Sequence, residues 1–336
     1  MPYLWVIRSF GGFVITLVWR TDIHLADTSP QSRTDDWTTT ILGKIQQVGS
    51  IARAEKAAAV LDGGDFFHIK SPGRNSHELV LKAAEAHLAY SCPVYGNVGN
   101  HDVKYGNMEF LPESPLGVLF ASGVFKRLYD EHEAVFEQGG VKVRVVGIPY
   151  HGTKYDMNRF TSISKGDEDY LVVIAHCLAS QAGGTMFEAE DIVRYSDLVN
   201  SDADVFCFGH WHKDQGITEI AKGKTVINIG SMSRGSISQD DLERTPSCVV
   251  MKFTAGAAHF EKVPLRVAPP SEVFNLAGRT RMIERQNTMN DVVDRLKGAL
   301  DMRTEGSILD LVREAHSVPD PIKERTLMYL EKAGAR

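Results

Sequence analysis

Five apolar, strand-like runs in this 336-residue chain end at residues of the kinds that bind metals. In an α/β sheet, the carboxyl ends of parallel strands meet at one edge, where ligands bind. The pattern therefore predicts an α/β fold that gathers these side chains at one place. The segments that follow the five runs are, in order, Asp22-Ile23-His24, Gly64-Asp65, Gly99-Asn100-His101-Asp102, His176 and Gly209-His210-Trp211-His212.

Hydrophobic periodicity predicts alternating strands and helices in the first part of the chain and mostly strands later. Residues 38–58 and 75–90 have helical spacing, with Asn75 or Ser76 as the N-cap of the second helix. Mixed βαβ followed by β-rich sequence predicts stacked sheets with helices outside. The predicted strands are 13–20, 59–61, 93–95, 141–148, 170–175, 204–208, 225–229, 247–253 and 259–265.

Composition is typical of a globular protein, and the chain ends predict accessory segments. The formal net charge of -6 excludes a general basic coat for nucleic acid but not a local basic cleft. The apolar stretch 13–19 is too short to span a membrane, so residues 1–12 are interpreted as a leader of unclear role. Pro269-Pro270 marks a boundary between a catalytic domain at 13–267 and a small helical extension at 268–336. Apolar stripes in this extension, at 289–300 and 308–315, predict docking on the main domain or on a partner.

Four cysteines without a CxxC pair are best explained as buried, reduced thiols, which favours a cytoplasmic protein.

The chemistry of the gathered side chains predicts two divalent metal ions. Carboxylates, an amide oxygen and imidazoles crowded together would repel or stay unsatisfied without cations, and this mixture suits manganese, with iron, zinc or magnesium as alternatives. Asp65 would bridge the ions by giving one oxygen to each. We expect Asp22, His24 and His212 to hold one ion, and Asn100, His176 and His210 to hold the other.

The Gly99-Asn100-His101-Asp102 motif also supplies candidate catalytic residues. His101 would stay unliganded and point at a phosphate, and Asp102 would fix the orientation and tautomer of its ring. Taken singly, each of these motifs is often incidental. The complete ordered set is not explained by chance.

This ordered set resembles the calcineurin-like metallophosphoesterase superfamily from Phe13 to Leu265, about three quarters of the chain. The resemblance implies a four-layer αββα sandwich with a dinuclear metal site on its edge, and the assignments above match the family pattern. One departure is Ala26, where relatives often have glycine.

The second motif, Gly64-Asp65-Phe66-Phe67-His68, is similar to that of SbcD-type DNA repair exonucleases. In that branch a histidine at the position of His68 assists cleavage of a nucleic-acid phosphodiester. The alternative is a loop histidine bonded to backbone. Further expected substrate contacts are Lys70, Arg74 and Arg234, with Tyr155, Arg159 and Phe160 as weaker candidates.

The sequence thus leads to a metal-dependent phosphodiesterase, a DNA exo- or endonuclease of repair or recombination, in which hydroxide from the metal pair attacks phosphorus in line. His68 or His101 would help the leaving oxygen depart. The rivals are a small-molecule phosphoesterase acting on nucleotides or cyclic nucleotides, and a non-catalytic scaffold. The resemblance also implies DNA as substrate, an SbcC-type coiled-coil ATPase docked on the C-terminal helices, and a homodimer.

Overall fold

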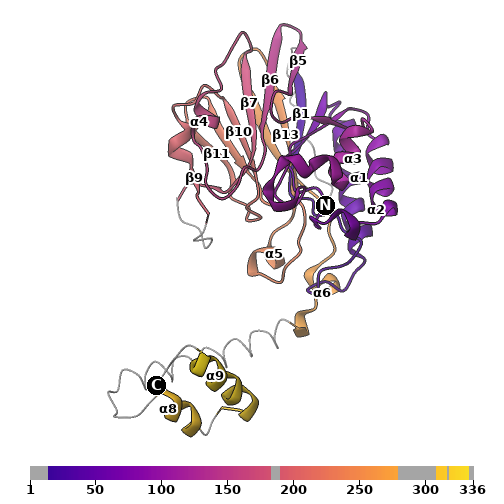
Figure 1. The fold of residues 1–336 in the computed structure, drawn as a ribbon. Helices are drawn as coiled ribbons and strands as arrows, with labels where there is room; N and C mark the ends of the chain where they lie inside the picture. The colour runs from indigo at the N-terminus through magenta and orange to yellow at the C-terminus, as the bar shows by residue number, and fades with distance from the viewer. Residues whose placement is uncertain (1–13, 183–189, 279–307, 316–317, 333–336) are drawn as a thin grey trace, which may run out of the picture. The chain divides into compact units, whose positions relative to one another are not determined.

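The computed structural model of the protein describes residues 14–182, 190–278, 308–315 and 318–332. By compactness the chain divides into two units, the first ending at Phe274 and the second beginning at Asn275. Two six-stranded sheets and one two-stranded sheet make up the described β-structure, all of it in the first unit (Figure 1).

The first sheet has β1, β2, β3 and β4 parallel to one another, with β13 antiparallel beside β1 and β14 antiparallel to β13 at the edge. Val18 on β1 pairs with Val60 on β2, which in turn pairs with Val94 on β3, so the three strands end together. The strands lie in the order β14 (Ala258–Pro264), β13 (Ser247–Phe253), β1 (Ile15–Arg20), β2 (Ala59–Asp62), β3 (Val94–Gly96) and β4 (Phe125–Arg127).

The second sheet has β12, β10, β7 and β6 parallel, with antiparallel β11 and β5 at its edges. The strands lie in the order β11 (Gly216–Ala221), β12 (Lys224–Asn228), β10 (Val205–Gly209), β7 (Tyr170–His176), β6 (Val141–Ile148) and β5 (Glu133–Gln138). The small sheet pairs β8 (Ala179–Ser180) with β9 (Val193–Arg194).

Helices cover the outer face of each large sheet. The described helices of the first unit are α1 (Trp37–Ala54), α2 (His77–Leu88), α3 (Pro115–Ala121), α4 (Asn158–Thr161), α5 (Gln239–Glu243) and α6 (Pro270–Val273). Short 3-10 turns are η1 (Pro72–Arg74), η2 (Lys104–Gly106), η3 (Met108–Glu113) and η4 (Tyr195–Leu198). Figure 1 shows α1, α2 and α3 together on one side of the sheets and α4 on the other.

Three apolar clusters separate four layers, which confirms the α/β sandwich expected from the sequence. Side chains alternate along a strand, so Val18 of β1 packs under α1–α3 while its neighbours Leu17 and Trp19 fill the space between the sheets. The third cluster lies on the outer face of the second sheet, where Phe160 of α4 and Leu198 of η4 pack against it.

Local sequence explains the two long helices of the first unit. Asp36 caps α1 by accepting a hydrogen bond from the Thr39 amide, and Ser76 caps α2 in the same way. The face of α1 that carries Ile41, Ile45 and Val48 is buried against the first sheet.

The second unit contains α8 (Ile308–Glu314) and α9 (Asp320–Lys332), which pack against each other. The first unit extends to Phe274, seven residues past the boundary expected after residue 267. The physical reason is that Phe274 bridges to Arg33 and lies beneath its guanidinium group, 4.7 Å from ring centroid to Cζ. The expected leader at 1–12 and the stripe at 289–300 lie outside the described residues. None of the described helices combines the length and apolarity needed to cross a membrane.

Candidate metal centre

The ends of five strands bring the predicted side chains together. Asp22 and His24 follow β1, Asp65 follows β2, Asn100 and His101 follow β3, His176 ends β7, and His210 and His212 follow β10. Three groups of described residues have possible ligand atoms within 4.8 Å of one another. One holds only the imidazoles of His24, His68 and His101, and the two that include carboxylates are the candidate ligand sets. The first set is Asp22, His24, Asp65 and His212, and the second is Asp65, His176 and His210.

The backbone is strained where these side chains leave the strands. Asp22, His24, Asp65 and His210 all have positive φ, between 51° and 93°, which non-glycine residues rarely adopt. Such strain persists only where the surrounding structure fixes it, and it gathers at functional sites. At Gly99 a Cβ atom would lie 2.2 Å from Asp65 Oδ1, so only glycine lets the two loops approach this closely.

Asp65 is the residue shared by the two ligand sets, and its oxygens have different partners. Oδ1 accepts a 2.7 Å hydrogen bond from the His101 amide. Oδ2 lies 3.7 Å from His24 Nε2 and 3.4 Å from His176 Nε2. Oδ2 therefore faces both sets, while Oδ1 accepts from the backbone. The expectation that each oxygen serves one ion stays a prediction.

His176 shows how well the second set fits a cation. A carbonyl oxygen can only accept, so His176 Nδ1, 2.9 Å from Gly63 O, carries its proton. The Nε2 atom then faces Asn100 Oδ1 at 3.2 Å and Asp65 Oδ2 at 3.4 Å. Burial opposes protonation, yet the charge of Asp65 raises the pKa of His176 to about 9. In the protonated ring the second proton is on Nε2. The Nε2 atom and the two oxygens converge, so a divalent ion could bind there in place of that proton.

The first set presents neutral imidazoles. His24 Nε2 lies 2.9 Å from His212 Nε2, and His212 Nε2 lies 3.7 Å from Asp22 Oδ1. Burial, and then the nearby His212, lower the pKa of His24 well below its usual value, and burial lowers the pKa of His212. Metal ligands must be deprotonated, so these histidines are in the state that a cation requires.

Asp102 does not orient His101, which corrects the prediction from sequence. Its buried carboxylate accepts hydrogen bonds of 2.8–3.3 Å from the amides of Gly99, Asp65, Phe66 and Phe67. Burial, and then the charge of Asp65, raise the pKa of Asp102 to about 8. Asp102 therefore ties the loop after β3 to the loop that carries Asp65.

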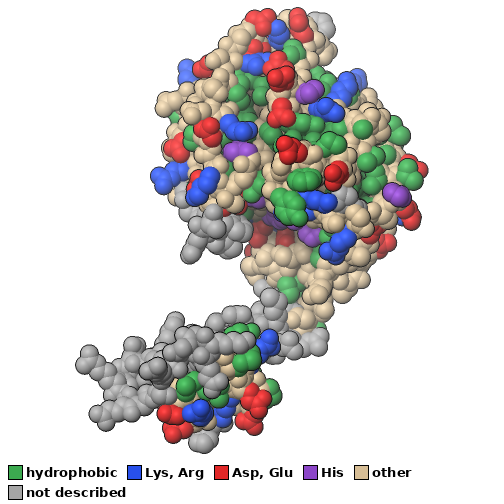
Figure 2. All heavy atoms as spheres, in the orientation of Figure 1, with side chains coloured by type: hydrophobic (Ala, Val, Ile, Leu, Met, Phe, Trp, Pro, Cys, Tyr) green, Lys and Arg blue, Asp and Glu red, His purple; other side chains and the backbone are tan. Residues whose placement is uncertain are grey.

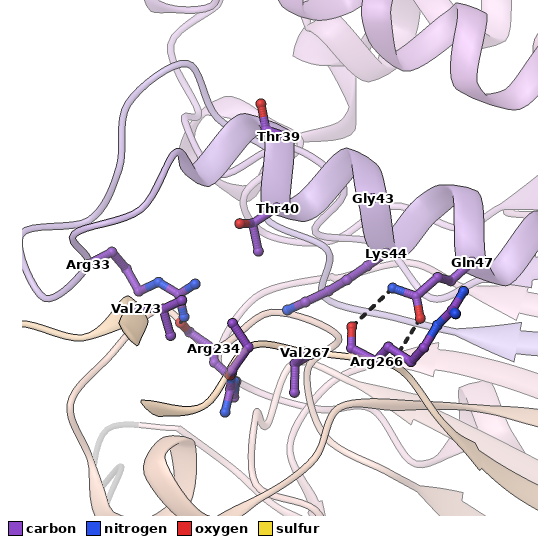
Figure 3. Close-up of a pocket in the computed structure, with 11 residues that line it drawn as sticks. Arg33, Thr39, Thr40, Gly43, Lys44, Gln47, Arg234, Arg266, Val267 and Val273 are labelled. Atoms are coloured by element: carbon purple, nitrogen blue, oxygen red, sulfur yellow. Dashed lines mark hydrogen bonds between the residues drawn. The ribbon is translucent and has the colours of Figure 1, made fainter. Parts of the chain in front are cut away.

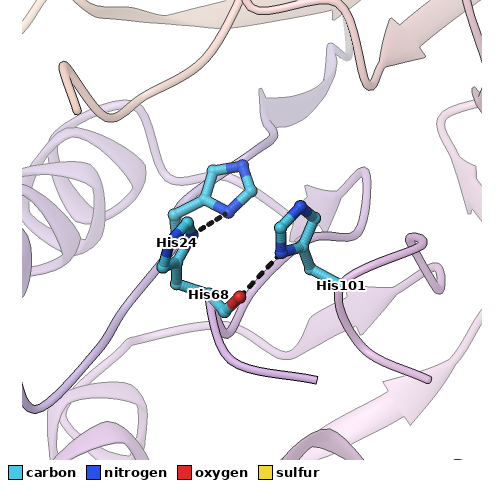
Figure 4. A group of neighbouring side chains, drawn as sticks. All are labelled: His24, His68 and His101. Atoms are coloured by element: carbon cyan, nitrogen blue, oxygen red, sulfur yellow. Dashed lines mark hydrogen bonds between the residues drawn. The ribbon is translucent and has the colours of Figure 1, made fainter. Parts of the chain in front are cut away.

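His101 is instead held by backbone. Its Nδ1 lies 2.7 Å from the carbonyl oxygen of His68 (Figure 4). Nδ1 must donate this bond, so Nε2 is the ring atom left to exchange a proton. The rings of His68 and His101 are stacked, with centroids 5.2 Å apart, and His68 Nδ1 lies 3.3 Å from His24 Nδ1.

A cleft of about 840 Å³ opens over these groups. It is lined by Asp65, Asn100, His101, Leu178, Glu190, His210, Trp211, His212, Lys213, Ser236, Ser238, Asp240 and Asp241. This volume is in the range of small-molecule and cofactor sites, which is about 300–1,000 Å³.

Glu190 is a site residue that sequence reasoning missed, and no spacing or motif around it gave a signal. Its Oε1 lies 2.9 Å from His210 Nε2 and also accepts the hydroxyl hydrogen of Tyr155. Although burial opposes ionisation, the hydrogen bonds with His210 and Tyr155 lower the pKa of Glu190. A carboxylate behind a ligating imidazole fixes its ring and raises its basicity.

Glu190→Gln is therefore expected to weaken metal binding at the set that contains His210 by about 10–100-fold. Titration calorimetry of the metal-free protein with Mn²⁺ measures this directly. Asp191→Asn, which removes the next carboxylate along the chain, is the matched control and should bind as the unaltered protein does. Equal affinities in both variants would exclude a positioning role for Glu190.

The predicted substrate contacts divide into two groups. Lys70 and Arg74 are exposed on the loop after His68, as expected for residues that meet a substrate. Arg234 is wrong as a surface contact: it is only 3% exposed, and its guanidinium donates to Ala268 O. Phe160 is wrong as well, because it is fully buried under the second sheet.

The other two weaker candidates for substrate contacts, Tyr155 and Arg159, stay predictions. Tyr155 supports Glu190, and Arg159 is exposed.

Comparisons with known proteins agree with this geometry. Residues 16–214 match the model of the calcineurin-like phosphoesterase family. The double-strand break repair protein MRE11 of Encephalitozoon cuniculi is 23% identical over 297 residues, covering 76% of this chain and 48% of that protein. The chain thus spans about half the length of this curated relative.

Similar solved structures include a dimetal phosphatase from Danio rerio, with a TM-score of 0.49, 12% identity and coverage of 74% of this chain and 96% of that one. Protein TT1561 of Thermus thermophilus has a TM-score of 0.44, 12% identity and coverage of 74% and 99%. The family match spans more than half of the chain and includes Asp22, Asp65 and His210. The chain therefore belongs to the calcineurin-like phosphoesterases, a family of dinuclear metallophosphoesterases.

Proposed function

We propose that this metallophosphoesterase is a nuclease that hydrolyses DNA phosphodiesters in repair or recombination, with manganese as its metal. The observation that carries the proposal is the stacked pair of His68 and His101 beside the shared carboxylate Asp65. The similarity to the MRE11 repair protein supports it.

The loop after His68 fits a polyanion. Lys70 and Arg74 are exposed there, and neither forms an ion pair with a described residue. Phosphate contacts by such residues would add affinity for a nucleic-acid backbone. Elsewhere on the face shown in Figure 2, acidic and basic side chains are interspersed, so the substrate would be held at the cleft and not over a broad basic surface.

The chain supplies the ligands and the proton-transfer groups. Bound cations would provide a hydroxide nucleophile at neutral pH and clamp the oxygens on phosphorus. His101, with Nδ1 bonded to His68 O, exposes Nε2 to the cleft and can donate a hydrogen bond to a phosphate oxygen when protonated. Burial, and then the neighbouring His101, lower the pKa of His68. A lower pKa makes protonated His68 a stronger acid toward the leaving oxygen.

His68→Ala is expected to separate the two candidate substrate classes. The sugar oxygen that leaves when DNA is hydrolysed needs a proton, whereas the phenolate of bis(p-nitrophenyl) phosphate does not. We expect DNA cleavage to fall about 10²–10⁴-fold while hydrolysis of the chromogenic diester changes little. The measurement compares hydrolysis rates, each with manganese, on labelled single- and double-stranded DNA, on bis(p-nitrophenyl) phosphate and on the monoester p-nitrophenyl phosphate.

His132→Ala, which removes an exposed imidazole away from the site, is the control. The proposal fails if the unaltered protein cleaves no DNA with any divalent metal.

The second candidate is a small-molecule phosphoesterase acting on nucleotides or cyclic nucleotides. The cleft favours it in one respect: its volume of about 840 Å³ is in the range of small-molecule sites. Strong hydrolysis of the phosphomonoester, with no loss in His68→Ala, would select this function. A coiled-coil ATPase partner and a homodimer stay predictions.

A further inference from the structure

A second cavity, of about 180 Å³, lies beside α1 on the first unit (Figure 3). It is built from α1, from the loop before it, and from the segments that follow β12 and β14. The lining residues are Arg33, Thr39, Thr40, Gly43, Lys44, Gln47, Arg234, Arg266, Val267, Ala268 and Val273. Four of these are cationic, and none is acidic.

The carboxylates near this cavity already have partners. Asp35 forms a bidentate pair with Arg33 and accepts from Thr40 Oγ1. Asp241 is bonded to Arg244 and Ser236. Among the described residues, Lys44, Arg234 and Arg266 have no ion pair, so three positive charges remain uncompensated at the cavity.

Two of these cations are buried and have N–H groups that lack a hydrogen-bond acceptor among the described residues. Lys44 is only 2% exposed, and its ammonium group makes a single 2.9 Å hydrogen bond, to Met232 O. An ammonium has three donors. Arg234 is 3% exposed, and its Nε has no hydrogen-bond partner among the described residues.

Burying unpaired charge is costly, and the cost falls when a counter-ion is present. Burial, and then Arg234 and Arg33, lower the pKa of Lys44 well below its usual value. Figure 3 shows the Lys44 side chain reaching from α1 toward the space between Arg33 and Arg234. An anion in that space would stabilise the charged form of Lys44 and accept hydrogen bonds from the spare donors.

We propose that this cavity binds a small phosphate-type oxyanion, held by Lys44 and Arg234, with the exposed Arg266 at its rim. The volume is below the usual range for whole organic ligands, about 300–1,000 Å³, so it fits inorganic phosphate or one terminal phosphate of a larger molecule. This inference does not depend on the nuclease assignment.

The cavity is connected to the metal centre through one short segment. Lys44 donates to Met232 O, and Arg33 donates to Arg234 O, on the cavity side. On the other side Ser231 Oγ donates to the carbonyl oxygen of Asp22. Anion binding would therefore stabilise the segment that supports a predicted metal ligand.

The test is binding of inorganic phosphate to the metal-free full chain in EDTA, where the metal centre lacks its cations. Thermal unfolding at constant ionic strength, with chloride as reference, should show a saturable rise in Tm, and calorimetry should give a Kd. The same measurements with pyrophosphate and with AMP show whether the cavity takes only free phosphate or also the terminal phosphate of a larger molecule.

Lys44→Met keeps the buried alkyl stem and removes the charge, and Arg266→Gln removes the exposed cation at the rim. We expect phosphate affinity to fall at least about tenfold in Lys44→Met, as for loss of a charge-assisted hydrogen bond, and several-fold in Arg266→Gln. Lys82→Met, on the exposed side of α2, should bind as the unaltered protein does. Without phosphate, Lys44→Met should unfold at the same or a higher temperature, because a buried unpaired charge is gone.

The proposal is overturned if phosphate raises Tm no more than chloride does, or if both cavity variants keep the original affinity. Should Lys44→Met fail to fold, Arg266→Gln decides the question by itself. Inhibition of the manganese-loaded enzyme by phosphate should be the same in Lys44→Met as in the unaltered protein, because that effect arises at the metal centre.

Discussion

Asp65→Asn is expected to abolish phosphoester hydrolysis, with a loss on the order of 10³-fold or more. Asp65 is the one carboxylate common to both ligand sets, and its Oδ2 faces His24 and His176 at 3.7 and 3.4 Å. An amide keeps the shape of the side chain but not its charge. Metal ions supply several kcal/mol of transition-state stabilisation, and each 1.36 kcal/mol corresponds to a factor of ten in rate.

The measurement pairs steady-state rates on bis(p-nitrophenyl) phosphate with metal content after manganese loading. We expect the variant to hold fewer ions than the unaltered protein. Asp197→Asn, which neutralises an exposed aspartate on η4, should match the unaltered protein in both readouts. Full activity with two bound ions in Asp65→Asn would contradict the assignment of this residue as the bridge.

The second large effect is on the free energy of unfolding after metal removal. The metal-free protein should lose stability as the pH rises from about 6.5 to 9. His176 has a folded pKa of about 9 against an ordinary value of 6.5, because Asp65 outweighs burial. A raised folded pKa gives stability that is complete below the unfolded pKa and lost as pH rises through the folded one. For His176 the loss is about 3 kcal/mol.

Other groups at the site do not reverse this trend. The pKa of Asp102 is raised to about 8, so its contribution is also lost as pH rises through that value. The pKa values of His24 and His212 are lowered, so their effect is a gain of stability with rising pH that is complete by about pH 7. Metal-bound protein should behave differently, because binding to deprotonated ligands strengthens as pH rises.

Thermal unfolding in EDTA and in excess manganese, from pH 6 to 9, tests this. The Tm of the metal-free protein should fall by several degrees, and the difference between the two conditions should widen. In Asp65→Asn the decrease in Tm of the metal-free protein between pH 6 and 9 should be smaller, because the charge that raises the His176 pKa is gone. A metal-free Tm that stays constant or rises above pH 7 would rule out this account.

Most elements of the two sheets could be predicted from periodicity. The strands at 141–148 and 247–253 were predicted with their observed bounds, and Ser76 is the N-cap of α2 as one of two predicted candidates. The edge strands β4, β5 and β11 and the short helix α3 were missed. Edge strands such as β5 are largely exposed and lack a continuous apolar pattern, so their pairing depends on neighbours distant in sequence.

Residue types and order were enough to predict which side chains meet at the metal centre, because parallel strand ends share one edge. Hydrogen-bond partners were not predictable in this way. The partners of Asp102 are amides of the loop that carries Asp65, and His101 is held by the His68 carbonyl. Both contacts join loops that follow different strands, so they depend on how the two strand ends are placed in space.

By itself, the sequence determined the α/β sandwich, the set of candidate ligands and their approach to one another, since these follow from periodicity and from the position of polar residues at strand ends. Only the tertiary structure decided that one oxygen of Asp65 faces both ligand sets, that Glu190 supports His210, and that Arg234 is buried beside Lys44. The physical reason is that hydrogen bonds and burial depend on distances of a few ångströms between segments far apart in the chain, and local patterns carry no such distances.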